Sequence, residues 1–175
     1  MLNGFMKRFG LDKDQEKTQA IAEDLLAVAD GHVISITDVK DPVFAQKMIG
    51  DGFACIPDNG SVYSPVSGTI TTVFPTKHAY GITTDQGLEV LIHIGIDTVS
   101  LKEDAFVTNL KSGDAIKAGD LIASVDLDIL KKEEKDPSVI VIIPNSQDVS
   151  EVQLLKTGLQ AAKTRVAQVS LNSVD

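Results

Sequence analysis

Between residues 87 and 99, apolar side chains occupy every second position, and this alternation constrains the fold more than any other feature of the sequence. Successive side chains of a strand point to opposite faces, so the alternating residues can share one buried face. These residues are Leu88, Val90, Ile92, Ile94 and Ile96. His93 has the opposite parity and points away from that core, beside Gly95. From this segment alone, the ordinary explanation is a half-buried strand with an incidental surface histidine.

A second β-rich segment, residues 73–82, precedes the first and is joined to it by a short turn that ends in Gly87. Two such segments around a glycine-containing turn predict a hairpin. The hairpin would bring His78 close to His93, so two of the three histidines of the chain would lie on adjacent strands. Near neutral pH an imidazole is partly unprotonated and can act as nucleophile, base or metal ligand.

The residues around the two histidines form two distinctive strings. Residues 74–82 read FPTKHAYGI, and residues 91–102 read LIHIGIDTVSLK. In order, spacing and residue type these strings resemble the glucose-type enzyme IIA family of the bacterial sugar phosphotransferase system. The resemblance covers residues 26–171. It implies a flexible N-terminal segment, residues 1–18, followed by a phosphotransferase IIA domain, residues 19–175.

The resemblance implies the chemistry of the site. In this family the second histidine carries a phosphoryl group on Nε2, which implies that His93 is the acceptor and that a backbone carbonyl near Gly95 orients Nδ1. His78 would stabilise the phosphoryl oxygens, and Thr76 would support the site through its hydroxyl. Two interpretations of Asp97 stay open: it attracts a cationic group of the donor, or it caps the turn.

The resemblance also implies partners. The chain would accept phosphate from phospho-HPr and pass it to a cysteine of a IIB domain of a glucose-type permease during sugar uptake. An alternative stays open, in which the chain is a regulatory module that senses sugar supply by binding transporters or glycerol kinase-like enzymes. An exposed apolar rim would dock these partners. Its members would be Phe44, Phe74, Leu91 and Val99, although Phe44 could equally belong to the core.

A metal-binding interpretation is also open, because two neutral imidazoles can bind zinc. A stable zinc site needs a third or fourth ligand, and the sequence has no His-x-His or His-Glu-x-x-His string. We therefore expect that no cofactor is required. A zinc ion held by His78 and His93 and completed by a carboxylate of a partner remains an option that the resemblance also implies.

Regularly spaced turns after residue 53 predict an all-β fold, namely an antiparallel sandwich or barrel-like single domain with short helical turns. Between residues 18 and 30 local propensity favours a helix, whereas the resemblance implies strands, and we follow the resemblance. We expect one short helix within residues 127–135, a strand buried on both faces at residues 138–143, and a closing strand at residues 165–171.

Composition excludes several classes. There are 16 Lys and Arg residues against 25 Asp and Glu, and the net charge of -9 argues against binding to nucleic acid. The single cysteine, Cys55, excludes an internal disulfide, and with no apolar run of membrane-spanning length and no evident signal peptide we expect a cytoplasmic protein. Apolar residues at positions 2, 5, 6 and 9 have helical spacing, which fits either a frayed tail or a weak membrane contact through residues 2–9.

One short segment departs from the family. The family usually has glycines at the position of Glu103 or Asp104 and at the position of Ala105. We therefore expect an altered loop just beyond the site, with a change in loop geometry more than in chemistry.

Overall fold

The computed structural model describes residues 21–144 and 148–172, and in this part of the chain every strand pairing is antiparallel. The strands are β1 (Ile21–Leu26), β2 (Gly31–Ser35), β3 (Gly50–Pro57), β4 (Ser61–Tyr63), β5 (Gly68–Val73), β6 (Ala79–Thr83), β7 (Glu89–Ile94), β8 (Phe106–Val107), β9 (Ala115–Ile116), β10 (Leu121–Val125), β11 (Val139–Pro144), β12 (Val149–Leu154), β13 (Gly158–Gln160) and β14 (Arg165–Leu171). The helical elements are short: η1 (Ile36–Asp38), α2 (Pro42–Ala45), η2 (Thr98–Ser100) and α3 (Leu127–Lys132). The predicted all-β antiparallel fold is confirmed.

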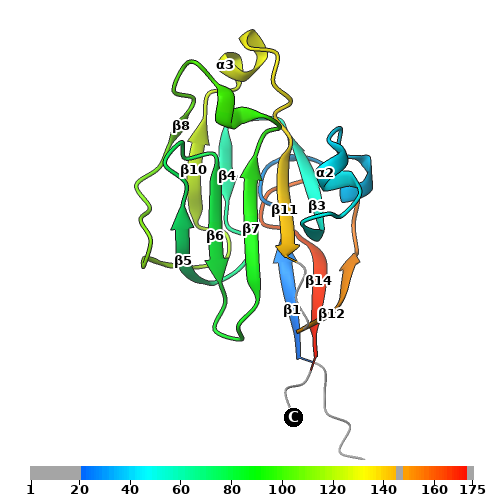
Figure 1. The fold of residues 1–175 in the computed structure, drawn as a ribbon. Helices are drawn as coiled ribbons and strands as arrows, with labels where there is room; N and C mark the ends of the chain where they lie inside the picture. Colours follow the sequence, from blue (N-terminus) through cyan, green and yellow to red (C-terminus); the bar gives the residue numbers. More distant parts are fainter. Residues whose placement is uncertain (1–20, 145–147, 173–175) are drawn as a thin grey trace, which may run out of the picture.

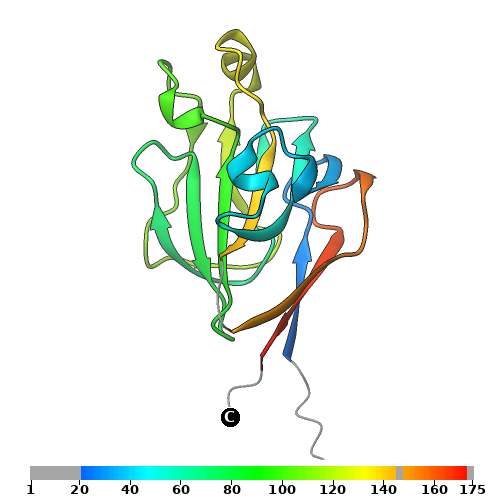
Figure 2. The same cartoon turned by 45° about the vertical axis from the view of Figure 1, so that its right-hand side comes forward.

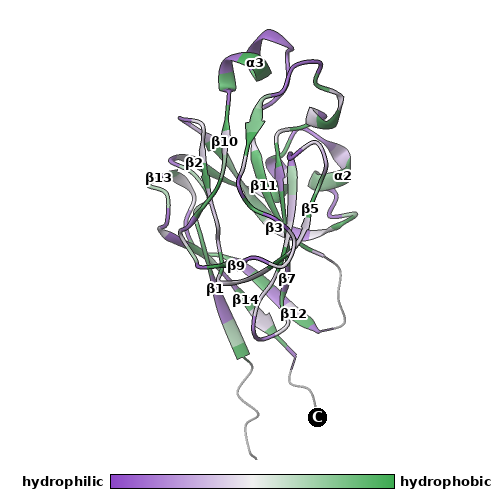
Figure 3. Ribbon diagram, turned by 90° about the vertical axis from the view of Figure 1, so that its left-hand side faces the viewer, coloured by the Kyte–Doolittle hydropathy of each residue, from purple (hydrophilic) through white to green (hydrophobic). Residues whose placement is uncertain are grey.

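The strands form three sheets (Figure 1). The largest has the order β13-β2-β3-β11-β7-β6-β5-β9, and the two smaller sheets have the orders β1-β14-β12 and β4-β10-β8. The sheet that contains β1 and β14 extends away from the rest of the molecule at the end opposite α3, as a second view makes clear (Figure 2). Figure 3 shows hydrophobic colours along β11 and hydrophilic colours on much of the chain around α3.

The predicted hairpin is present as β6 and β7, with Ala79 opposite His93. Burial along β7 alternates as expected: Val90, Ile92 and Ile94 are buried, whereas His93 is half-buried. β11 lies between β3 and β7, and its residues from Val139 to Ile143 are buried, which confirms the strand buried on both faces. β7 therefore carries His93 on a strand with neighbours on both sides.

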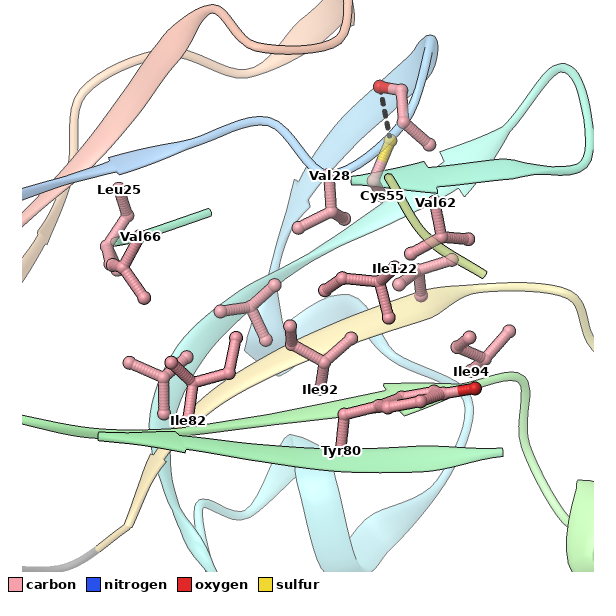
Figure 4. Packing of buried hydrophobic residues seen from close by; sticks show 14 of the residues in the cluster. Leu25, Val28, Cys55, Val62, Val66, Tyr80, Ile82, Ile92, Ile94 and Ile122 are labelled. Carbon is pink, nitrogen blue, oxygen red and sulfur yellow. Dashed lines mark hydrogen bonds between the residues drawn. The ribbon is translucent and has the colours of Figure 1, made fainter. Parts of the chain in front are cut away.

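The main core fills the space between the large sheet and the smaller sheets. Tyr80, Ile92 and Ile94 point from β6 and β7 toward Val62 of β4 and Ile122 of β10 (Figure 4). Burying an aliphatic side chain of this size contributes roughly 1.5–3 kcal/mol relative to leaving it exposed. Cys55 is part of the same cluster, and its thiol donates to the carbonyl of Ala29 at 3.5 Å. Burial raises the pKa of this thiol to about 12, so Cys55 behaves as an apolar core residue.

A second cluster packs on the other face of the large sheet, under η1 and α2. It is formed by Ile36, Val39, Phe44, Ala54, Ile140 and Ile142. Phe44 is only 7% exposed, so the expectation that it stands on an exposed apolar rim is wrong and the core alternative holds. The physical reason is the short helix α2, which turns Phe44 onto the sheet. Asp41 caps this helix by accepting a hydrogen bond from the backbone N–H of Val43.

The segment with helical propensity is the strand β1. Leu25 is fully buried and pairs with Ala167 of β14, the predicted closing strand. Pairing along the whole of β1 and the burial of Leu25 outweigh a weak local preference for helix. The predicted helix within residues 127–135 is also present as α3. His32, the third histidine of the chain, lies in β2 with its side chain exposed.

The loop that departs from the family needs no glycine, because Glu103, Asp104 and Ala105 all have negative φ. Glu133, just after α3, accepts hydrogen bonds from the backbone N–H groups of Lys102 at 2.8 Å and Glu103 at 3.3 Å. Exposed Lys132 also pairs with Glu103 at 2.5 Å. The loop thus adopts ordinary backbone conformations without the glycines of the family.

The question of membrane contact concerns residues 2–9, which lie outside the described residues. Within residues 21–144 and 148–172, no helix has the length and apolar character that crossing a membrane requires.

Candidate functional site

His93 is presented by β7 in a defined tautomer. Its Nδ1 lies 2.7 Å from the carbonyl oxygen of Gly95. Because a carbonyl can only accept, Nδ1 carries the hydrogen and Nε2 keeps its lone pair. The nitrogen that is free for chemistry is therefore the one that the family resemblance implies.

The turn after β7 depends on Gly95. Its φ is +76°, a region that favours glycine, and a Cβ at this position would lie 2.4 Å from Cγ2 of Thr98 and 3.0 Å from the carbonyl oxygen of Asp136. The N–H of Gly95 donates to the carbonyl of Ser138 at 2.8 Å, and the N–H of Ile96 donates to that of Asp136 at 2.9 Å. The carbonyl that orients His93 thus belongs to a tightly held turn.

His78 lies in the tight turn between β5 and β6, at the residue before β6 begins. The N–H of Lys77 donates to the carbonyl of Phe74 at 2.7 Å, and Pro75 suits the second position of such a turn. Lys77 has a φ of +59°, and its carbonyl accepts a hydrogen bond from the hydroxyl of Tyr80 at 2.7 Å. This geometry buries His78 to 4% exposure.

The two histidines meet as the hairpin predicts. Their ring centroids are 4.9 Å apart, with an interplanar angle of 80°. Thr76 makes a short hydrogen bond between its hydroxyl and Nδ1 of His78. If Thr76 donates this bond, Nε2 of His78 carries the hydrogen and can donate to a ligand. The ring of Phe74 lies 5.5 Å from His78, and the ring of Phe44 lies 5.1 Å from His93.

Burial keeps both imidazoles neutral. It lowers the pKa of His78 to about 4, with a smaller contribution from His93. Burial also lowers the pKa of His93, and the hydrogen bond to Gly95 and the carboxylate of Asp41 oppose this shift. At neutral pH the pair therefore offers one lone pair and one N–H donor without a positive charge.

The low pKa of His78 makes folding sensitive to acid. The unfolded chain binds a proton near pH 6.5 and the folded chain near pH 4, so the contribution of His78 is constant above pH 6.5 and unfavourable to folding below it. Between these limits we expect the wild type to lose up to about 3 kcal/mol relative to His78→Gln. Denaturant unfolding of both proteins across this range checks the prediction, and parallel pH dependences would contradict it.

Asp97 stands at the N-cap position of η2 with a φ of +58°, and its side chain makes no capping hydrogen bond to the backbone. Its carbonyl accepts a hydrogen bond from the hydroxyl of Ser100 at 2.8 Å. Its carboxylate pairs with Lys135 at 2.8 Å, and this hydrogen bond lowers the pKa of Asp97. Attraction of a cation of a donor stays a prediction.

Three of the four predicted docking residues reach the surface. Val99 is 59% exposed, Phe74 is 38% exposed, and Leu91 is half-buried. Val99 lines a cleft of about 280 Å³ beside Thr76 and Lys77. The fourth, Phe44, is buried, and its ring lies against that of His93.

Among the described residues no group of three or more His, Cys, Asp or Glu side chains could hold a metal ion. The pair His78 and His93 supplies two imidazole ligands, fewer than the four of a tetrahedral zinc site. A zinc ion at this pair would depend on side chains from another molecule.

Sequence reasoning missed two residues of the site. Asp41 acts on His93 through its charge, yet it lies in a loop about fifty residues away along the printed sequence. Thr98 is 1% exposed, and its hydroxyl donates to the carbonyl of Ile94 at 2.5 Å. No periodicity marks either residue. The only sequence signal near Thr98 is the family resemblance of residues 91–102, which include it.

Comparison with known proteins gives a consistent result. Residues 23–149 match the family model described as phosphoenolpyruvate-dependent sugar phosphotransferase system, EIIA 1. The chain is 42% identical to the glucose-specific EIIA component of the phosphotransferase system of Halalkalibacterium halodurans, over 97% of each chain. It is 38% identical to a solved structure of glucose permease IIA from Mycoplasma capricolum, with a TM-score of 0.76 over 85% of this chain and 96% of that one.

A longer relative has a similar segment. The chain is 51% identical to part of the glucose-specific EIICBA component of Streptococcus pneumoniae, over 86% of this chain, and it spans 21% of the length of that protein. The match to the family model covers both histidines, Thr76 and the turn after β7. The chain therefore belongs to the EIIA 1 family of the phosphoenolpyruvate-dependent sugar phosphotransferase system.

Proposed function

We propose that this protein is a phosphoryl carrier of a glucose-type sugar phosphotransferase system. It accepts a phosphoryl group from phospho-HPr on His93 and passes it to a cysteine of a IIB domain in the cytoplasm. The observation that carries the proposal is the histidine pair, in which the Gly95 carbonyl holds Nδ1 of His93 and leaves Nε2 free. Membership of the EIIA 1 family and the names of the relatives support the same role.

In the first transfer the lone pair of Nε2 of His93 forms a bond to phosphorus as the bond between phosphorus and the imidazole of HPr breaks. The electron pair of the broken bond returns to the donor imidazole. Phosphoryl transfer depends mainly on positioning and on stabilising charge on the three outer oxygens. The hydrogen bond from Nδ1 to Gly95 favours this step, because it stabilises positive charge that develops on the ring of His93.

His78 contributes the charge stabilisation. Thr76 holds Nδ1 of His78, and we infer that Nε2–H points to the phosphoryl oxygens. A neutral donor binds these oxygens without trapping them as an ion pair would, which suits a group that must be passed on. In the second transfer the thiolate of the IIB cysteine attacks phosphorus, and the electron pair of the N–P bond returns to His93.

The proposed transfer requires no cofactor, because the nucleophile and the leaving group are both parts of proteins. Zinc binding at His78 and His93 would block the same nitrogens that take part in the transfer. We therefore propose that a shared zinc ion, with its remaining ligands from a partner, is compatible only with a state in which phosphate is not being transferred.

The test of the proposed function is uptake of label from phosphorylated HPr. We expect stoichiometric, acid-labile and base-stable labelling of the purified protein, followed by loss of the label when a IIB domain is added. Labelling that is stable in acid, or none at all under conditions in which HPr itself is phosphorylated, would overturn the proposal. In the second case, a regulatory module that binds transporters or glycerol kinase-like enzymes becomes the better explanation.

The docking face can be tested separately from the chemistry. We propose that partners dock on Phe74, Leu91 and Val99, and we expect Val99→Asp to weaken HPr binding at least about tenfold, because burying an unpaired carboxylate in an apolar contact is unfavourable. Leu159→Asp is the control, because Leu159 is 67% exposed on β13, outside this face. Titration calorimetry of both variants checks the prediction, and equal affinities would contradict it.

A further inference from the structure

We infer that Thr98 is a positioning residue for phosphoryl transfer, which acts by holding the turn whose carbonyl selects the tautomer of His93. The inference rests on the proposed function and deepens it. Thr98 does not touch the reacting nitrogen. Its methyl group packs where a Cβ of Gly95 would lie, and its hydroxyl donates to the carbonyl of Ile94.

Two consecutive peptide units after His93 are each held at both ends. In the unit that joins Ile94 to Gly95, the carbonyl accepts from the hydroxyl of Thr98 at 2.5 Å and the N–H donates to Ser138 at 2.8 Å. In the unit that joins Gly95 to Ile96, the N–H donates to the carbonyl of Asp136 at 2.9 Å. The carbonyl of this second unit is the one that accepts from Nδ1 of His93.

Thr98 differs from the other contacts of the turn because it acts through a side chain. The remaining bonds to the two peptide units run between backbone groups or come from His93 itself. Gly95 has a left-handed φ of +76° and has no side chain to restrict it. Without the hydroxyl of Thr98, the first peptide unit keeps only its N–H bond and can rotate, and this rotation moves the next carbonyl away from Nδ1.

The chemical consequence lies in the tautomer. A neutral imidazole carries its hydrogen on either nitrogen, and the hydrogen bond made by one nitrogen decides which. If the carbonyl of Gly95 moves, Nδ1 loses its acceptor and part of the population places the hydrogen on Nε2. Those molecules cannot attack phosphorus through Nε2. They expose a lone pair on Nδ1, so some phosphate should appear on the wrong nitrogen.

The chain provides a matched control in Thr108. Its hydroxyl also donates to a backbone carbonyl, that of Ile122, at 2.7 Å, and its side chain is partly buried. Neither Thr108 nor Ile122 makes a hydrogen bond with His93 or with the turn after β7. The Thr108 hydroxyl also interacts with the hydroxyl of Tyr80, which donates to the carbonyl of Lys77 on the His78 side of the site. Thr98→Val and Thr108→Val thus remove the same kind of hydrogen bond with the same change of shape, one in the turn that orients His93 and one outside that turn.

The experiment measures ¹⁵N chemical shifts of His93 at a pH of about 8, before any donor is added, and then uptake from phospho-HPr. We expect the Nδ1–H tautomer to dominate in the wild type, in Thr98→Ser and in Thr108→Val. We expect Thr98→Val to show a mixture of tautomers, uptake at least about tenfold slower, and a detectable fraction of Nδ1-phosphohistidine in ³¹P spectra.

A Thr98→Val protein with the tautomer and uptake rate of Thr108→Val would overturn the inference, because both variants would then report only stability. Failure of Thr98→Ser to restore the wild-type tautomer would overturn it too. If Thr98→Val does not fold, Thr98→Ala takes its place, because it removes the same hydroxyl without adding a second methyl group on Cβ. The same criteria apply to it. The tautomer is read without phosphate, so failure of the proposed carrier function would leave this part of the test intact.

Discussion

Replacing His93 with alanine should abolish phosphoryl uptake from phospho-HPr. No other described side chain offers a neutral nitrogen in the same position, since Nε2 of His78 is assigned to donating a hydrogen bond. Phosphoryl transfer also requires alignment with the donor, which a displaced nucleophile does not achieve. Single-turnover labelling with radioactive phosphate should therefore give no adduct above background.

The control for this variant is His32→Ala, which removes the exposed histidine of β2 and should label as the wild type does. The rate of uptake by the wild type should fall in acid only below the ordinary pKa of histidine, because burial lowers the pKa of His93 and keeps it neutral. Label that persists in His93→Ala would show that another residue is the acceptor.

Replacing His78 with alanine should slow transfer by roughly 10²–10³, by analogy with the loss of one donor that stabilises developing charge. His78→Gln retains an N–H donor and should lie between alanine and the wild type. The nucleophile remains in both variants, so each should still reach full labelling given time. Rapid-quench measurement of uptake from HPr and of release to a IIB domain checks both steps.

The two histidine variants together assign the roles. Full and rapid labelling of His78→Ala would remove His78 from the mechanism. An unlabelled His78→Ala protein beside a labelled His93→Ala protein would reverse the assignment. Near-equal rates for His78→Gln and His78→Ala would indicate that the amide does not reach the phosphoryl oxygens, and would weaken the hydrogen-bonding role of Nε2.

The parts of the site that the sequence predicts are those that follow from local periodicity. The alternation along β7 places His93 on the opposite face from Ile92 and Ile94, and the short turn before β7 brings His78 beside it. Both inferences require only the period of a strand and the pairing of two neighbours in sequence. The family resemblance added the roles of the two residues, which periodicity does not contain.

The parts that the sequence did not predict depend on contacts between distant segments. Phe44 is apolar and close to the site in either interpretation, and only the packing of α2 on β3 and β11 shows that it is buried. The carboxylate of Asp41 acts on the pKa of His93 from a segment that is equally distant in the sequence. The missing glycines near Glu103 were expected to alter the loop, but the carboxylate of Glu133 binds its backbone in an ordinary conformation.

The pairing of Ile21 with Leu171 has a consequence for how the protein can be tethered. β1 and β14 place both positions at the end of the molecule away from α3 (Figure 1). Any chain joined at either position must therefore travel along the sandwich before it can bring a second domain to the loops around α3. Each residue of a linker spans at most about 3.5 Å, so short linkers would hold such a domain away from these loops. The effective concentration of a fused partner would be set by linker length, with longer linkers required before intramolecular encounter becomes efficient.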